Sequence, residues 1–269
     1  MCKGITLIRG DCSNELERID ESSIDCCVTS PPYWNLRNYG DANGLGTESS
    51  PEKYLGHLCD IFNSIYTKLK PSGTCWVNIG DTYLDKQLLG IPWRFALNLQ
   101  AAGWVLRQDI VWHKSNAMPE SVKDRCTRAH EYIFLLTKSI SYYFDIDAIK
   151  EPTEYTGREY TPKEQPEELR IRRGLPLVGE RTVRQKKSVW SITHKPSKFP
   201  PHHATFPEDL IEPCIKAGCP ENGIVLDPFS GTGTTGAVAQ RLGCKYIGIE
   251  INDEYLQFSR QRLEQQRLF

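Results

Sequence analysis

Residues 224–250 constrain the fold of this chain more than any other segment. An apolar run at 224–226 leads into a turn with glycines at positions 231 and 233, and a second apolar run at 245–249 ends at Glu250. Between the two runs, residues 235–242 have the spacing of a short helix. A strand, a glycine-rich turn, a helix and a second strand form a nucleotide-type βαβ unit with a ligand site at the turn. The sequence therefore predicts an α/β fold.

The rest of the chain fits the same fold class. Apolar runs predict further strands, and helical periodicity predicts helices that alternate with them, which indicates a layered domain with a mainly parallel sheet. The pattern stops at Glu151 and resumes at 189–192, where four residues form an apolar cluster. The predicted strands are 5–8, 24–28, 74–79, 104–112 and 131–137, and the predicted helices are 13–19, 51–69, 92–100, 207–217 and one capped by Asn252.

Three ligands compete for the turn at 227–236. A nucleoside triphosphate is disfavoured, because the turn lacks the lysine that a P-loop places after its last glycine. A dinucleotide fits the spacing, since Glu250 lies seventeen residues beyond Gly233 and can accept hydrogen bonds from ribose hydroxyls. The turn opens with Asp227, however, and this carboxylate suits a cationic ligand without phosphates better than a pyrophosphate. S-adenosylmethionine, with an amino group, a sulfonium and a ribose, meets that description.

A second feature is the segment Thr-Ser-Pro-Pro-Tyr at 29–33, directly after the apolar run 24–28. Its two prolines must end the strand, because neither can donate a hydrogen bond to a neighbouring strand. They leave a rigid corner of carbonyl acceptors, with the hydroxyl of Ser30 and the aromatic ring of Tyr33 beside them. An exocyclic amine on a planar base suits this corner, since the amine donates while the base stacks. For these five residues alone, a proline turn beside a core tyrosine is the alternative.

Together the two segments resemble the motifs of the amino-methylating DNA methyltransferases. Residues 227–233, Asp-Pro-Phe-x-Gly-x-Gly, resemble the methyl-donor motif of that family, and residues 29–33 resemble its catalytic motif. The catalytic motif precedes the donor motif, which is the order of the family's β group. The resemblance covers nearly the whole chain and is weakest at 151–187.

The resemblance implies a Rossmann-like S-adenosylmethionine-dependent methyltransferase fold with a circularly permuted motif order. Its seven-stranded mixed sheet would have 104–112 and 131–137 as an antiparallel edge, and the opening strand would lie beside the strand that ends at Glu250. The implied organisation is a catalytic half at 1–150, an inserted variable segment for target recognition at 151–187, and a cofactor-binding half at 188–269.

The resemblance also assigns the cofactor site. Glu250 would hold the ribose hydroxyls of S-adenosylmethionine, and Asp11 would lie near its adenine. Six residues of the donor motif would line the methionine part: Asp227, Phe229, Ser230, Gly231, Thr232 and Gly233. A segment that resembles the one closing over the cofactor contributes His203, Thr205 and Phe206.

The catalytic residues that the resemblance implies are Ser30, Pro31, Pro32 and Tyr33. Ser30 and the Pro31 carbonyl would accept the two amino protons of a flipped base, and Tyr33 would stack on it. In this family a serine at the first position goes mostly with cytosine N4, so this amine is favoured, with adenine N6 as the alternative. Carbon-5 methylation would need a cysteine nucleophile; Cys214 follows a proline but lies in a predicted helix, where core packing explains it.

The expected partner is double-stranded DNA. From residue 158 to 198 there are eleven Lys and Arg against five Asp and Glu, although the whole chain has a net charge of −1. This basic excess marks 151–187 as the segment expected to recognise the target. The residues expected to contact DNA are Trp34, Arg37, Tyr39, Lys114, Arg125, Arg170, Arg172, Arg173 and Arg184.

The cysteines and the apolar segments indicate the cell compartment in which the protein is expected. The ten cysteines are scattered, without a C-x-x-C pair or a Cys/His cluster, which indicates buried thiols in a reducing compartment and no metal site. No segment has the length of a membrane span, and the N-terminus lacks a signal-peptide pattern. We therefore expect a protein of the cytoplasm of a bacterial, archaeal or phage-infected cell, without membrane contact.

Several alternatives stay open from the sequence alone. The same chemistry could act on an RNA base or a glutamine side chain, a nicotinamide oxidoreductase could use 224–250 as a dinucleotide site, and a binding protein could have lost catalysis. A cognate restriction endonuclease that acts separately is compatible with the family. The choice between monomer and dimer is also open.

Overall fold

The computed structural model describes residues 4–35, 44–152, 183–193 and 206–265. The chain forms two compact units, Met1–Asp145 with Ser188–Phe269, and Ile146–Lys187. The functional division at 1–150, 151–187 and 188–269 stays a prediction.

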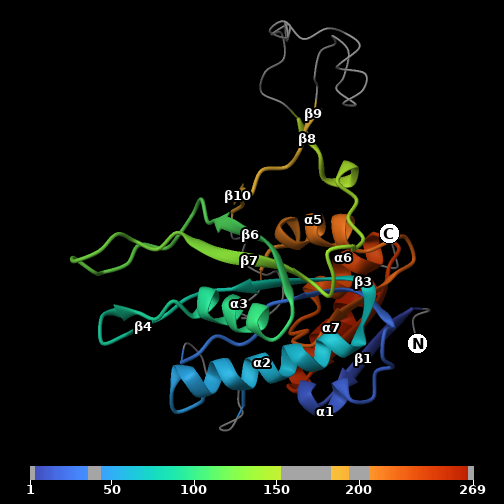
Figure 1. The fold of residues 1–269 in the computed structure, drawn as a ribbon, viewed down its shortest axis with the longest axis horizontal. Coiled ribbons are helices and arrows are strands. Elements are labelled where there is room, and N and C mark those ends of the chain that lie inside the picture. The colour runs from blue at the N-terminus through green and yellow to red at the C-terminus, as the bar shows by residue number, and fades with distance from the viewer. Residues whose placement is uncertain (1–3, 36–43, 153–182, 194–205, 266–269) are drawn as a thin grey trace, which may run out of the picture. The chain divides into compact units, whose positions relative to one another are not determined.

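The larger unit is built on one mixed sheet (Figure 1). Parallel pairing joins the first five strands of the sheet, whereas β7 is antiparallel to both β3 and β6. In the described residues the sheet has eight strands, in the order β1 (Ile5–Arg9), β12 (Lys245–Glu250), β11 (Ile224–Asp227), β2 (Ile24–Thr29), β3 (Leu69–Ile79), β7 (His130–Thr137), β6 (Val105–His113) and β10 (Val189–Ser191).

This topology confirms the predicted α/β class, the mixed sheet and two placements within it. The opening strand β1 pairs with β12, and β6 with β7 forms the antiparallel part. The predicted number of seven strands was wrong, because β10 adds an eighth beside β6. Two features stabilise this eighth strand. The Trp190 side chain is buried, and the backbone N–H of Val111 on β6 donates to the Ser188 carbonyl at 2.8 Å.

Helices cover both faces of the sheet. On one face α2 packs between α1 and α3, and on the other α6 packs between α5 and α7. The described helices are α1 (Cys12–Leu16), α2 (Pro51–Lys68), α3 (Ile91–Ala101), α5 (Glu208–Gly218), α6 (Thr234–Arg241) and α7 (Asp253–Gln265).

Two local sequence signals fix helix starts. Ser50 accepts a hydrogen bond from the Lys53 N–H at the start of α2, and Asn252 accepts from the Glu254 N–H at 2.9 Å before α7, which confirms the predicted cap. The helix predicted at 51–69 is observed as α2 and ends one residue earlier than predicted. The helix ends at Lys68 because buried Leu69 already pairs with Ile24, and the proline is accommodated where the β2–β3 register shifts.

Smaller elements complete the description. The hairpin β4 (Tyr83–Leu84) and β5 (Gln87–Leu88) follows β3 in the larger unit. The smaller unit contains η1 (Asp147–Ile149), β8 (Glu151–Pro152) and β9 (Val183–Arg184). Within the described ranges, no helix is long and apolar enough to cross a membrane.

Candidate active site

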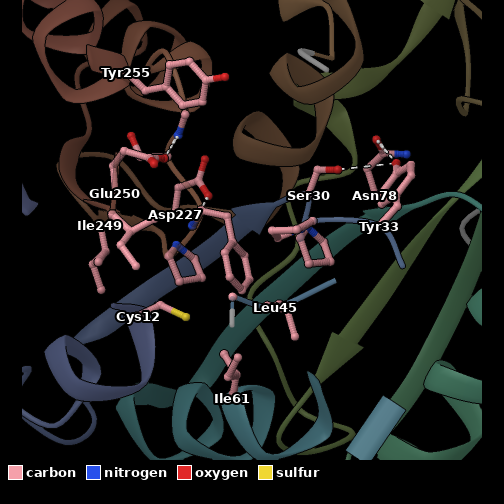
Figure 2. Close-up of a pocket in the computed structure, with 18 of the residues that line it drawn as sticks. Cys12, Ser30, Tyr33, Leu45, Ile61, Asn78, Asp227, Ile249, Glu250 and Tyr255 are labelled. Atoms are coloured by element: carbon pink, nitrogen blue, oxygen red, sulfur yellow. Dashed lines mark hydrogen bonds between the residues drawn. The ribbon is translucent and has the colours of Figure 1, made fainter. Parts of the chain in front are cut away.

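A cavity of about 310 Å³ lies where the predicted catalytic and donor motifs meet. Residues that follow β2 and β11 line it from two sides: Ser30 and Tyr33 from the first segment, and Phe229 and Gly231 from the second. Figure 2 shows Asp227 and Glu250 on one side of the cavity, with Ser30, Tyr33 and Asn78 on the other. Two segments that are about 200 residues apart in the sequence therefore share one site.

Asp227 joins these two segments. It is the last residue of β11 and lies beside the last residue of β2, Thr29, whose hydroxyl donates to Asp227 Oδ1 at 2.6 Å. Thr235 donates to Oδ2 at 2.6 Å, and the Phe229 N–H donates to Oδ1 at 3.1 Å. Burial raises the pKa of the Asp227 carboxyl from 3.8 to about 6, although all three hydrogen bonds favour the ionised form.

Glu250 organises the glycine-rich turn. One carboxylate oxygen accepts from the Gly231 N–H at 2.7 Å, and the other accepts from the Asn252 N–H at 2.8 Å. Burial raises the pKa of this carboxyl. Each oxygen accepts one described hydrogen bond and has a further lone pair for a ligand hydroxyl.

The turn needs glycine at position 233. The backbone there has a φ of 76°, and a Cβ would lie 2.7 Å from Ser259 Oγ on α7. Ser259 in turn donates to the Gly231 carbonyl at 2.9 Å, which ties α7 to the turn. Close packing behind the turn thus leaves its backbone facing the cavity.

The groups on this side fit S-adenosylmethionine. Thr232 Oγ1 is buried in the cavity wall and has no hydrogen-bond partner among the described residues, which suits a polar ligand. Two buried carboxylates with raised pKa values, Asp227 and Glu250, suit a ligand that brings positive charge and hydroxyl donors. Among the described residues, no three His, Cys, Asp or Glu side chains could hold a metal ion together.

Most of the predicted cofactor residues line the cavity. Asp11 does so while its side chain accepts from the Ser13 N–H at the start of α1, and Ser230 is also hydrogen-bonded to the Tyr246 hydroxyl at 2.9 Å. Gly233 lies behind the turn, against Ser259. The lining includes Asp11, Phe206, Asp227, Phe229, Ser230, Gly231, Thr232 and Glu250. His203 and Thr205 lie outside the described residues.

The catalytic corner is anchored by a hydrogen bond from α2. Ser30, Pro31, Pro32 and Tyr33 all line the cavity. The Pro32 carbonyl accepts a hydrogen bond from the hydroxyl of Tyr54 on α2 at 2.8 Å, so it is engaged with the fold. Ser30 Oγ donates a long hydrogen bond to the Tyr33 hydroxyl at 3.4 Å.

Sequence reasoning missed two polar residues next to this corner. The hydroxyl of Tyr33 donates to Glu131 Oε2 at 2.8 Å, and Asn78 Nδ2 donates to the same oxygen at 3.1 Å. Asn78 had a usable signal, because a polar residue within the buried run 74–79 needs a hydrogen-bond partner. Glu131 had none, since it stands at the exposed-looking start of a strand. On the cofactor side, the sequence did not predict cavity residues that lie next to predicted ones, such as Cys12 and Ile251.

The residues expected to contact DNA have varied positions. Lys114 lines the cavity and pairs with Glu131. Arg125 pairs with Glu120 and lies over the Tyr83 ring, whereas Arg184 pairs with Glu151 within the smaller unit. Five of them lie outside the described residues: Arg37, Tyr39, Arg170, Arg172 and Arg173.

Trp34 has a structural role in the fold. Its side chain is buried, and its indole N–H donates to the Glu48 carbonyl at 2.9 Å. This packing places Trp34 in the core, and its expected contact with DNA stays a prediction. Cys214 is likewise buried on α5, as its interpretation as a core residue requires.

Comparisons with known proteins identify the family of this chain. A family model described as DNA methylase matches residues 24–261. The Type II methyltransferase M.Cfr9I of Citrobacter freundii is 41% identical over 290 residues, which covers 97% of this chain and 88% of that protein. M.SmaI of Serratia marcescens is 38% identical over 291 residues, with 97% and 91% covered.

Solved structures share the fold. PvuII DNA methyltransferase (cytosine-N4-specific) superimposes with a TM-score of 0.73 at 22% identity, over 96% of this chain and 86% of that one. The putative DNA modification methylase TTHA0409 of Thermus thermophilus, complexed with S-adenosyl-L-methionine, gives a TM-score of 0.65 at 23% identity, over 97% and 93%. The fold is therefore that of the S-adenosylmethionine-dependent methyltransferases. With a family match over most of the chain and curated relatives near 40% identity, the chain belongs to the amino-methylating DNA methyltransferases.

Proposed function

We propose that this enzyme transfers a methyl group from S-adenosylmethionine to the N4 amine of cytosine at a specific site in double-stranded DNA. The observation that carries the proposal is the shared cavity, in which the Ser30–Tyr33 corner faces Asp227 and Glu250. Bound S-adenosylmethionine supplies an electrophilic methyl group, so an amine can react by direct displacement. The target base has to leave the double helix to reach such an enclosed site.

The catalytic corner would position the amine. Ser30 Oγ and the Pro31 carbonyl accept its two hydrogens, which turns the nitrogen lone pair toward the side of the cavity that holds Asp227. Tyr33 offers its ring as a stacking surface for the base. The enzyme would thus accelerate methyl transfer by placing the nucleophile, with no covalent enzyme intermediate.

The cofactor side would bind by charge and hydroxyl contacts. Glu250 accepts from the ribose hydroxyls with the lone pairs that Gly231 and Asn252 do not use. Asp227 is engaged by three donors of the protein, so it acts on the positive methionine part through its charge. Thr232 Oγ1 supplies a further polar contact.

Cytosine N4 is preferred over adenine N6 for two reasons. The first position of the corner is the short, neutral Ser30, whereas an aspartate or asparagine goes mostly with adenine. The structurally similar PvuII enzyme is described as cytosine-N4-specific, although at 22% identity. Adenine N6 is the second candidate, because its amine meets the same acceptors.

The remaining assignments concern partners. We assign target recognition to 151–187, with Arg170, Arg172, Arg173 and Arg184 as phosphate or guanine contacts. The curated relatives are named Type II methyltransferases, which supports a cognate restriction endonuclease that acts separately. The nine described cysteines are all free, which supports the cytoplasm as the compartment.

Nucleoside mass spectrometry tests the proposed substrate. Unmethylated DNA is incubated with the enzyme and S-adenosylmethionine, digested and analysed, with RNA and total protein treated in parallel. N4-methylcytosine is the expected product. N6-methyladenine would leave the mechanism in place and overturn the base assignment, and methylation of RNA or glutamine alone would overturn the DNA substrate. Calorimetry with NAD in place of S-adenosylmethionine tests the oxidoreductase alternative, for which tight NAD binding would be required.

A further inference from the structure

Four neighbouring strands bring polar groups to the side of the cavity that holds Ser30. Tyr33 follows β2, Asn78 lies in β3, Glu131 in β7, and Lys114 follows β6, and these strands are adjacent in the sheet. Because β7 runs antiparallel to β3 and β6, its first residues lie beside the last residues of those strands. Side-chain exposure is only 13% for Glu131 and 25% for Lys114.

The hydrogen bonds of this cluster converge on the carboxylate of Glu131. Ser30 Oγ donates to the Tyr33 hydroxyl at 3.4 Å, and that hydroxyl donates to Glu131 Oε2 at 2.8 Å. Asn78 Oδ1, at 3.3 Å, is a second and more distant acceptor for the same hydroxyl. Asn78 Nδ2 donates to Glu131 Oε2 at 3.1 Å, and Lys114 Nζ pairs with Glu131 Oε1. Glu131 Oε2 is the nearer of the two acceptors of the Tyr33 hydroxyl, so it orients the Tyr33 proton toward itself and leaves the Tyr33 oxygen to accept from Ser30. The Ser30 proton is turned toward Tyr33, which leaves the Ser30 lone pairs for a donor in the cavity.

The ring of Tyr33 is held as well as its hydroxyl. A Cβ at Gly80 would lie 2.6 Å from Tyr33 Cε2 and 3.3 Å from Cζ, so the backbone approaches the ring more closely than any other residue would permit. The contact at Gly80 and the hydrogen bond to Glu131 together define the plane of the ring before a base arrives.

We propose that Glu131 is a positioning residue for methyl transfer. Through Tyr33 it keeps the Ser30 hydroxyl an acceptor for the target amine, and it holds the ring of Tyr33 in its stacking orientation. Lys114 supports it by binding the second carboxylate oxygen and balancing its charge. The inference rests on the proposed function, in which the amine binds at Ser30, and it is the same for cytosine and adenine.

A double-mutant cycle tests whether Glu131 acts through the Tyr33 hydroxyl. The Glu131→Gln, Tyr33→Phe and double variants are compared with the parent by single-turnover methyl transfer at saturating DNA and S-adenosylmethionine. The amide of glutamine cannot accept from Tyr33, Asn78 and Lys114 together. We expect Glu131→Gln to slow transfer by about 10- to 100-fold in the parent, but by less than about 3-fold when Tyr33 is already phenylalanine. The dissociation constant of S-adenosylmethionine should change by less than about 2-fold.

A matched control removes a different carboxylate–cation pair. Glu52 on α2 pairs with Arg94 outside the cavity, so Glu52→Gln should leave the transfer rate unchanged. If Glu131→Gln does not fold, Glu131→Asp, whose carboxylate is one methylene further from Tyr33, takes its place, and its loss must likewise shrink when Tyr33 is phenylalanine.

Two results would overturn the inference: an unchanged rate in the Glu131 variant, or an equal loss in both backgrounds, which a purely structural role would give. Failure of the proposed function looks different. In that case the parent itself transfers no methyl group to DNA.

Discussion

The hydroxyl of Thr29 donates a 2.6 Å hydrogen bond to the carboxylate of Asp227, across 198 positions of sequence. Thr29 directly precedes the catalytic corner, and Asp227 opens the cofactor turn. Both side chains are buried, with 1% exposure each. Together with the pairing of β2 and β11, this contact joins the corner to the turn.

Thr29→Val should therefore weaken both folding and cofactor binding. Valine keeps the volume but leaves a buried carboxylate oxygen with one donor fewer, which costs about 1–3 kcal/mol of the free energy of unfolding. Urea unfolding measures that cost, and calorimetry measures the affinity for S-adenosylmethionine. Thr29→Ser, which retains the hydroxyl, is the matched control. A valine variant as stable as the parent would show that the contact contributes nothing.

The raised pKa of Asp227 predicts a specific dependence of stability on pH. The folded protein holds this proton more tightly than the unfolded chain, with pKa values of about 6 and 3.8. The contribution of the group is thus complete below pH ~4 and is lost as the pH rises through about 6, by about 3 kcal/mol in all.

Asp227→Asn removes this titration while other groups continue to titrate in both proteins. The stability of the parent relative to the variant should therefore fall between pH 4 and 7, as measured by urea unfolding at each pH. The comparison with the variant is needed because the pKa of Glu250 is also raised, whereas the pKa values of Glu208 and Glu212 are lowered by their Arg241 and Lys216 partners. A constant difference across this range would contradict the assignment.

Two glycines with nearly the same positive φ allow the effect of backbone strain to be distinguished from that of steric contact. Gly233 has a φ of 76° and Gly243 a φ of 74°, but only Gly233 has an atom, Ser259 Oγ, within reach of an added Cβ. Gly243→Ala should cost about 1 kcal/mol through backbone strain alone. Gly233→Ala should cost more in unfolding free energy and should also weaken binding of S-adenosylmethionine at least about 10-fold, because the turn must move away from α7. Equal effects of the two variants on both measurements would show that the contact with Ser259 is unimportant.

The sequence predicts the parts of this site that follow from strand ends. The glycine-rich turn, Glu250 and the proline corner each stand where an apolar run stops, so their meeting at one edge of a parallel sheet follows from topology. The pairing of Glu131 with Tyr33 could not be predicted in this way, because it depends on the register of β7 against β3 and β6. Tertiary packing also determines the position of Trp34. Its neighbours in the sequence suggest a surface position, but the side chain is buried and its indole N–H donates to the Glu48 carbonyl.

The boundaries of two strands, β3 and β10, also depend on long-range contacts. The run at 71–73 has the composition of a turn, yet it lies within β3 because the partner strand β2 accommodates a register shift there. The strand at Val189–Ser191 is too short to predict by itself and forms because β6 offers an unpaired edge.

The most direct test of the central claim is label transfer by the parent and by Ser30→Ala. DNA is incubated with S-adenosylmethionine that carries a deuterated methyl group, and the nucleosides are analysed by mass spectrometry. Ser64→Ala, which alters an exposed hydroxyl on α2, serves as the control. We predict labelled N4-methylcytosine from the parent and the control, and a rate at least about 100-fold lower from Ser30→Ala with unchanged cofactor affinity. Labelled DNA at the parental rate from Ser30→Ala would contradict the account, because the amine would then not be held by this corner.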